Sequence, residues 1–239
     1  MNGLGACAVG RDMMLRILLV LLLSIPITAR AEAPAADIQA VVAKIQAFYE
    51  KTDGIDTRFT QTFRHGGMPS RLGGATAEGR LRFRKPVGES GPRMRWDYDD
   101  GRILLLVGDL SYTYDPDTQQ ITLYRLDPKT LSAAVSFLWG KGKLTDDFKV
   151  TASGRKDLGE GVALELVPKT GNGGFSKVLL LVDGATGLVR RSVVVQADGS
   201  ENHITFVEPK VGEVAPLSVF NPDTAFPKDA VRVDTQIGR

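Results

Sequence analysis

Six basic side chains lie between residues 80 and 98, a density that could bind phosphate or another anion: Arg80, Arg82, Arg84, Lys85, Arg93 and Arg95. In "RLRFRK" and "RMRWDY" they alternate with apolar residues, the period of two that is typical of a strand. "PVGESGP" between them has the Pro and Gly of a hairpin loop. The stretch therefore predicts two strands with one apolar and one basic face. A solvated basic face is the ordinary outcome, and a docking surface for an acidic partner or anionic lipid heads is the alternative.

Other motifs that could carry catalysis or a metal each lack a residue that the chemistry needs. His65 and His203 have no ligand spacing around them, and no G-x-S-x-G is present. In "GKGKLT" Leu144 stands where a phosphate loop needs Ser or Thr. "DPDTQQ" lacks the Gly and Glu of a calcium loop and predicts a turn. We therefore expect a binding protein with no metal or cofactor, with a lipid hydrolase as the enzymatic alternative.

The first residues are typical of an export signal. Arg11 and Arg16 precede the apolar run "ILLVLLLSIPI", and "TARA" ends at Ala31 with the small residues of a cleavage site. The run is shorter than the roughly 20 residues of a membrane span, although an uncleaved anchor is the alternative. We expect a signal peptide over residues 1–31 and a periplasmic mature chain, whether translation starts at Met1, Met13 or Met14.

The composition of the mature chain excludes further functional classes. Cleavage removes three basic residues and one acid, so the 30 basic and 28 acidic residues become 27 of each. A formally neutral chain argues against nucleic-acid binding, which depends on an excess of Lys and Arg. Cys7, the one cysteine, leaves with the signal, which excludes disulfides. Residues 32–239 are enough for a single domain, which we expect to be monomeric.

Periodicity predicts one helix followed by many strands. After Asp37, a candidate N-cap, apolar residues recur at helical spacing until "TDG" at 52–54. Short alternating segments follow, from "IDTRFTQTF" through "LSYTY" and "SKVLLLVD" to "NHITFVE". A second helix is predicted in "DPKTLSAAVSFLWGKG". This order indicates a mainly β or α+β fold in which a curved antiparallel sheet wraps a core or cavity.

Several of these segments, taken in order, resemble one known family. "RFTQTF" follows the helix, and then come "EGRLRFRKP", "MRWDY", "YDPDTQQIT" and "FKV…LELVPK…FSKVLLLVD". Their order and spacing are similar to those of the periplasmic outer-membrane lipoprotein carriers, the LolA family, from about Ala36 to the closing "VFNPDTAFPKDAVRV". The resemblance implies an incomplete, strongly curved antiparallel β-barrel with an N-terminal helix and a helical lid.

The resemblance also implies a function. Carriers of this family receive acylated lipoproteins from an inner-membrane ABC transporter, bury the acyl chains and deliver them to an outer-membrane acceptor. A chaperone is needed because each buried methylene is worth about 0.8 kcal/mol, which holds a lipidated protein in its membrane. Another lipid carrier, or a lipid-responsive regulator, on the same fold is the alternative. The regulatory type would need a second domain, for which this chain lacks room.

The same resemblance assigns site residues. We expect a cavity lined by the apolar strand faces: Phe59, Phe63, Leu81, Phe83, Met94, Trp96, Tyr98, Tyr112 and Tyr114. The lid would turn Leu131, Val135 and Leu138 towards it. The family closes the lid with an Arg before a Pro, and here Lys85 holds that position, which keeps the charge but not the planar guanidinium. For each apolar residue plain core packing is the alternative, and Lys85 could be an ordinary exposed lysine.

Overall fold

The computed structural model describes residues 37–66, 74–86, 91–125, 143–170 and 175–234. The predicted signal peptide, residues 1–31, and the predicted lid helix in 127–142 lie outside them. The helices are α1 (Ile38–Lys51), α3 (Leu144–Asp147) and the 3-10 helices η3 (Lys156–Leu158) and η4 (Leu217–Phe220). The strands are β1 (Gly54–Arg64), β2 (Ala75–Arg84), β3 (Arg93–Tyr98), β4 (Ile103–Val107), β5 (Leu110–Asp115), β6 (Gln120–Arg125), β7 (Phe148–Ala152), β8 (Val162–Pro168), β9 (Phe175–Val182), β10 (Val189–Gln196), β11 (Glu201–Val211) and β12 (Val231–Asp234).

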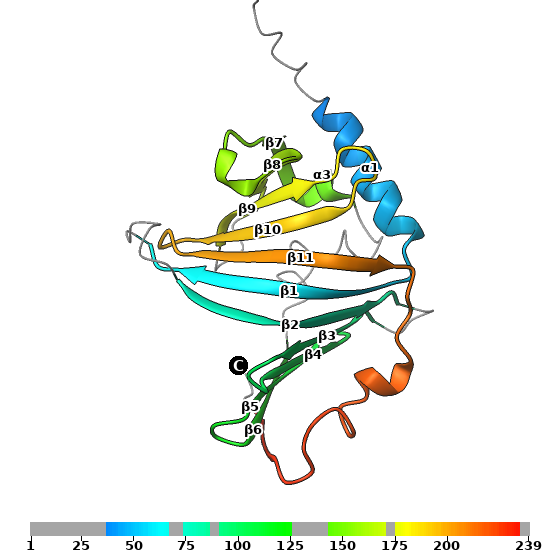
Figure 1. The fold of residues 1–239 in the computed structure, drawn as a ribbon, viewed down its shortest axis with the longest axis vertical. Coiled ribbons are helices and arrows are strands. Elements are labelled where there is room, and N and C mark those ends of the chain that lie inside the picture. Colours follow the sequence, from blue (N-terminus) through cyan, green and yellow to red (C-terminus); the bar gives the residue numbers. More distant parts are fainter. Residues whose placement is uncertain (1–36, 67–73, 87–90, 126–142, 171–174, 235–239) are drawn as a thin grey trace, which may run out of the picture. The chain divides into compact units, whose positions relative to one another are not determined.

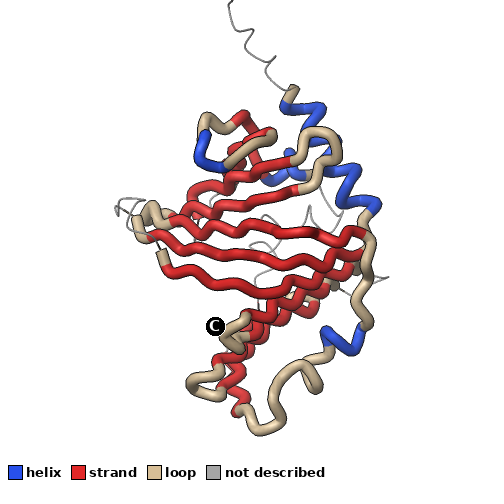
Figure 2. Tube along the Cα trace, in the orientation of Figure 1, coloured by secondary structure: helices blue, strands red, loops and turns tan. Residues whose placement is uncertain are grey.

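All twelve strands form one curved sheet that does not close (Figures 1 and 2). Their order is β12-β6-β5-β4-β3-β2-β1-β11-β10-β9-β8-β7. Every neighbouring pair is antiparallel except β12 and β6, which run parallel. The expectation of an incomplete, strongly curved antiparallel barrel is confirmed, with β12 as a strand that the sequence did not predict.

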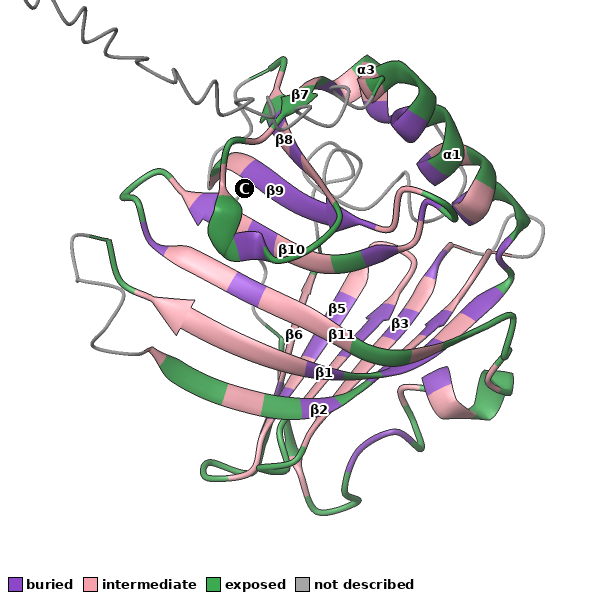
Figure 3. Ribbon diagram, turned by 45° about the horizontal axis from the view of Figure 1, so that its top comes forward, coloured by how far each residue is buried: buried purple, intermediate pink, exposed green. Residues whose placement is uncertain are grey.

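Helix α1 covers one face of the sheet, which we call the inner face. It begins as predicted, because the Asp37 carboxylate accepts hydrogen bonds from the backbone N–H groups of Gln39 (3.0 Å) and Ala40 (3.4 Å). Its buried stripe, which includes Ile45 and Tyr49, packs on apolar side chains of β8 to β10 such as Leu180. Figure 3 shows the buried positions of α1 on the side towards these strands.

The turn between β9 and β10 approaches the backbone of α1 closely. Gly187 has a φ of +86°, and a Cβ at this residue would lie 2.5 Å from the carbonyl oxygen of Lys44. The Lys44 ammonium in turn donates to the carbonyl of Gly184 at 2.8 Å. Both the left-handed conformation and the lack of space require glycine. Helix α1 is thereby fixed to the β9–β10 side of the sheet.

The outer face carries the predicted arginines of β2 and β3, and there the expectation of a solvated or docking surface is wrong for Arg82 and Arg95. The Asp97 carboxylate accepts hydrogen bonds from Arg82 and, at 2.8 Å, from Arg95. The side chains of Arg82 and Arg95 are only 20% and 14% exposed. Arg95 also donates to the carbonyls of Val219 (3.0 Å) and Ala225 (3.1 Å). The chain's own residues 212–230, which we call the strap, cover these arginines.

Gly187→Ala tests whether α1 depends on this close approach, with Gly212→Ala as its matched control. Gly212 has a φ of +84° but nothing lies within 4 Å of its Cβ position. Gly212→Ala should therefore lower the unfolding free energy by about 1 kcal/mol, which is the cost of placing an alanine in the left-handed backbone conformation. Gly187→Ala should lose at least about 2 kcal/mol more, because α1 must shift. Urea unfolding measures both, and equal losses would contradict the described packing of α1.

Candidate functional site

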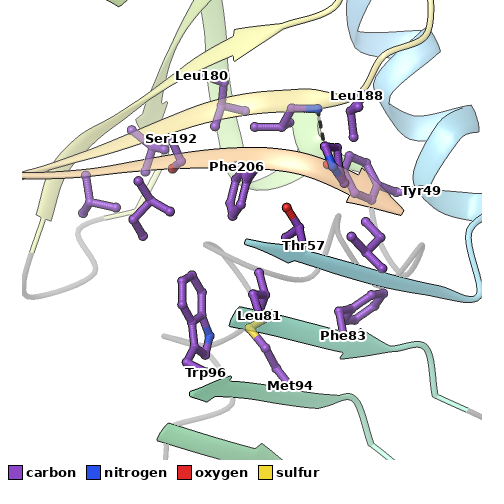
Figure 4. Close-up of a pocket in the computed structure, with 16 residues that line it drawn as sticks. Tyr49, Thr57, Leu81, Phe83, Met94, Trp96, Leu180, Leu188, Ser192 and Phe206 are labelled. Carbon is purple, nitrogen blue, oxygen red and sulfur yellow. Dashed lines mark hydrogen bonds between the residues drawn. The ribbon is translucent and has the colours of Figure 1, made fainter. Parts of the chain in front are cut away.

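A cavity of about 260 Å³ lies on the inner face, between β1–β3 and β9–β11, with Tyr49 of α1 at one end (Figure 4). Strands β1 and β11 are neighbours, so the sheet runs unbroken behind the cavity and curves round it on both sides. The wall is formed by Tyr49, Ile55, Thr57, Leu81, Phe83, Met94, Trp96, Val178, Leu180, Leu188, Val189, Ser192, Val194, Ile204, Phe206 and Pro209.

The wall is almost entirely apolar. None of these described residues is charged, and the polar side-chain groups are the hydroxyls of Tyr49, Thr57 and Ser192 and the indole N–H of Trp96. The Thr57 hydroxyl lies 2.9 Å from the carbonyl of Val207, at the bulge in β11. The Tyr49 hydroxyl accepts a hydrogen bond from the N–H of Val189 at 3.4 Å. Burial raises the pKa of Tyr49 well above the usual value for a tyrosine, so the end of the cavity at α1 stays uncharged.

Four of the predicted cavity residues lie in this wall: Leu81, Phe83, Met94 and Trp96. They share the inner face because β2 and β3 alternate without a bulge, so that Leu81 lies opposite Trp96 and Phe83 opposite Met94. Whether they bind an acyl chain stays a prediction.

Two further predicted residues, Phe59 and Tyr98, lie on the same inner face beside the wall. Phe59 packs edge-on against Trp96, with ring centroids 4.7 Å apart, and against Tyr98 at 5.2 Å. It lies over Gly79, its partner in β2, where a Cβ would come within 2.8 Å of the ring. Phe59 therefore packs between Trp96 and Tyr98, and neither Phe59 nor Tyr98 is among the residues that line the cavity.

The remaining predicted aromatic residues lie elsewhere. Phe63 contacts His65 near the end of β1, with centroids 5.1 Å apart. The prediction for Tyr112 and Tyr114 is wrong, because both point to the outer face. Their partners in β4 are Leu105 and Ile103, whose side chains face away from that of Leu104, the partner of Trp96. There they pack with residues of the strap, including Phe220 and Phe226.

Lys85 bonds to the end of α1. Its ammonium donates to the carbonyl of Glu50, in the last turn of the helix, and its N–H donates to the carbonyl of Asp53 at 2.9 Å. The preceding Arg84 instead donates to Ala215 of the strap at 2.7 Å. The predicted lid residues Leu131, Val135 and Leu138 lie outside the described residues, so the structure does not place Lys85 relative to them.

The sequence did not predict most of the residues in the wall. The larger part of these unpredicted residues comes from the second half of the chain: Val178, Leu180, Leu188, Val189, Ser192, Val194, Ile204, Phe206 and Pro209. The alternation in "RSVVVQ" and "HITF" predicted strands, but it could not indicate which face turns inward. Only the pairing of β1 with β11 brings these residues opposite Leu81 and Phe83.

The main cluster of titratable groups away from the cavity is structural. Arg155 binds both Asp157 (2.6 Å) and Glu201 (2.7 Å), and Glu201 in turn bonds to His203 at 2.7 Å. Arg155 lowers the pKa of Asp157 to about 2, and burial lowers the pKa of His203 against the effect of Glu201. Within the described ranges, no three His, Cys, Asp or Glu side chains gather as metal ligands, and no helix is long and apolar enough to cross a membrane.

Comparison with known proteins points to one family. The family model described as "Outer membrane lipoprotein carrier protein LolA" matches residues 50–223. A protein of Methylobacillus flagellatus named "Outer-membrane lipoprotein carrier protein" is 29% identical over 167 residues, 68% of this chain and 71% of its own. One of the same name from Nitrosomonas europaea is 28% identical over 186 residues, 76% and 81% of the two chains.

A solved structure shares the fold. An uncharacterised conserved protein from Thermus thermophilus superposes with a TM-score of 0.50 at 13% identity, over 82% of this chain and 98% of its own. At this identity the likeness shows the fold alone and does not bear on what either chain binds.

Tyr49→Phe tests the burial of the hydroxyl at the end of the cavity. In an unfolded chain tyrosine ionises near pH 10, whereas folded Tyr49 keeps its proton to higher pH. The wild type is thus fully stabilised below about pH 10 and loses stability above it, because the unfolded state then binds fewer protons. Between pH 10 and pH 11 the wild type should lose about 1 kcal/mol more unfolding free energy than Tyr49→Phe. Denaturant unfolding at pH 7, 10 and 11 measures this, and parallel curves would contradict it.

Proposed function

This chain belongs to the LolA family of outer-membrane lipoprotein carriers, and we propose that it shields the acyl chains of lipoproteins in the cavity between β1–β3 and β9–β11. In this proposal it is a periplasmic chaperone and no enzyme. It would take its cargo from an inner-membrane ABC transporter and release it to an outer-membrane acceptor.

The observation that carries the proposal is the wall of the cavity. An acyl chain presents no hydrogen-bonding group along its length, and the described wall consists of aliphatic and aromatic side chains with only Thr57 and Ser192 besides and without a charge. Each methylene that moves from water into such a site gains about 0.8 kcal/mol. The same apolar surface would be unfavourable in water when the carrier is empty, so a means of closing it is also required.

The contact of Lys85 with α1 supports a role in closing. Tyr49 and Phe83 both line the cavity. Glu50 follows Tyr49 directly, and Lys85 lies two residues after Phe83. The bond between the Lys85 ammonium and the Glu50 carbonyl therefore joins α1 to β2 beside the cavity. A cation is favourable at this end of the helix, where the carbonyl dipoles converge. We propose that the bond favours the closed, empty carrier, together with the lid predicted around Leu131, Val135 and Leu138.

Native mass spectrometry of the protein purified from its own periplasm tests the main proposal. We expect an acylated polypeptide to co-purify in a defined ratio and to be displaced by detergent. Val194→Phe, which fills part of the cavity, should reduce the occupied fraction several-fold. Val167→Phe is the matched control, because Val167 lies on β8 outside the cavity with 37% of its surface exposed, and it should leave the fraction unchanged.

Two results would contradict the lipoprotein function. If a free lipid were bound in place of an acylated polypeptide, the chain would be a carrier of another lipid on the same fold. If Val167→Phe reduced occupancy as much as Val194→Phe, the cargo would not lie in this cavity.

Lys85→Leu should leave uptake of acylated lipoprotein intact and slow its release. Loss of the bond to Glu50 destabilises the closed, empty state by about 1 kcal/mol, which corresponds to release about 5-fold less favourable. Transfer of a preloaded lipoprotein to outer-membrane vesicles measures release, and co-purification after co-expression measures uptake. Lys149→Leu, an exposed lysine on β7, is the control. Unchanged release in Lys85→Leu would show that Lys85 is an ordinary surface lysine.

A further inference from the structure

Two polar groups in the apolar wall, the hydroxyl of Ser192 and the indole N–H of Trp96, have no hydrogen-bond partner among the described residues. The hydroxyls of Thr57 and Tyr49 both lie within hydrogen-bond distance of backbone groups. The hydroxyl of Ser192 has no hydrogen bond in the part of the chain that the structure describes. Ser192 is half-buried on β10, between the cavity residues Val189 and Val194. An unpaired hydroxyl in an apolar wall costs free energy unless the ligand supplies a partner.

Two amide side chains, those of Gln61 and Asn202, lie near Ser192 on the neighbouring strands of the sheet. Ser192 lies opposite Ile204 of β11, which in turn lies opposite Gln61 of β1, so the three residues form one row. Gln61 shares the inner face with the cavity residue Thr57, four positions earlier in an unbulged strand, and Asn202 shares it with Ile204. Nε2 of Gln61 donates to Oδ1 of Asn202 at 2.9 Å. Within the described residues, Oε1 of Gln61 and Nδ2 of Asn202 have no further bond.

This row lies near one end of the cavity, and the lining residues Val194 and Val178 form the next row on the side away from Tyr49. Figure 4 shows Ser192 on the side away from Tyr49 and Leu188. Between Tyr49 and Phe206 the described inner face is apolar apart from the hydroxyl of Thr57, and the amide side chains of Gln61 and Asn202 follow beyond Phe206. A ligand that is apolar along its length and polar at its head would match this order.

We infer that Ser192, Gln61 and Asn202 form a polar subsite for the ester and amide carbonyls that join the acyl chains of the ligand to its head, with the chains directed towards Tyr49. The inference rests on the proposed acyl-chain function and adds an orientation to it. Ser192 is two strand spacings from Gln61, about 10 Å. The subsite therefore fits a lipid with several carbonyls, such as a diacylglyceryl-modified cysteine, better than one with a single carbonyl. The hydroxyl and the amide N–H groups donate to those carbonyl oxygens.

The test compares two ligands that differ only in these carbonyls: a diacylglyceryl-cysteine lipopeptide and its dialkyl ether analogue of equal chain length. The wild type should bind the ester ligand several-fold more tightly than the ether. Ser192→Ala should weaken ester binding about 5-fold, the effect of one hydrogen bond, and change ether binding less than 2-fold. Replacing the amide pair together, Gln61→Leu with Asn202→Leu, should act in the same direction without leaving one amide unpaired.

Val194→Ala is the matched control, because Val194 lines the cavity next to Ser192 on the same face of β10 but has no polar group. It should weaken binding of both ligands equally. Equal affinity of the wild type for ester and ether, or an equal loss for both in Ser192→Ala, would overturn the subsite and leave the proposed function intact. Failure of the wild type to bind either ligand would overturn the proposed function itself.

Discussion

An apolar cavity inside a curved sheet requires that the two walls be held apart, since burying them against each other would be favourable. The outer face supplies this support. Asp97 on β3 accepts bonds from Arg82 on β2 and from its own neighbour Arg95, and Arg95 extends to two carbonyls of the strap. Two adjacent strands and the C-terminal segment are thereby cross-linked behind Trp96 and Met94, so the curvature of this side does not depend on contacts across the cavity.

The other side of the cavity is supported in a different way. Strands β9 and β10 alternate between Leu180 and Val194, which line the cavity, and Leu179 and Val193, which are completely buried on the outer face against Leu158 of η3. Both faces of these strands are covered, which explains the continuous apolar run "VLLLV". Helix α1 is tied to this side through Gly187, and its own apolar stripe completes the core beyond the cavity.

The strands were predicted well from the sequence. Which face of each strand turns inward was predicted correctly for only some of them. For β2 and β3 the alternation separates arginines from aromatic residues, so the inner face follows once the fold class is assumed. In "LSYTY" the alternation is equally clear, yet Tyr112 and Tyr114 turn outward, because the strap supplies a second apolar partner in Phe226, with ring centroids 6.1 and 6.4 Å away. The alternation of residue types indicates that one face of a strand is apolar, but it does not indicate which other part of the chain covers that face. The coverage of Arg84 and Arg95 by the strap has the same explanation, since the strap carbonyls that they bind lie 124 to 131 residues away in the chain.

These supports leave the two ends of the cavity mechanically different. At the Ser192 end the row through Ile204 to Gln61 runs across three hydrogen-bonded strands, which cannot separate without breaking the sheet. Towards the opposite end the pairing of β10 with β11 stops at Arg191 and Thr205, and Lys85 links β2 to the end of α1 only through hydrogen bonds to the carbonyls of Glu50 and Asp53. Widening therefore costs least at the Tyr49 end. A ligand seated as proposed would lose its apolar contacts before its polar ones, so release would begin at the chain ends while the head is still bound.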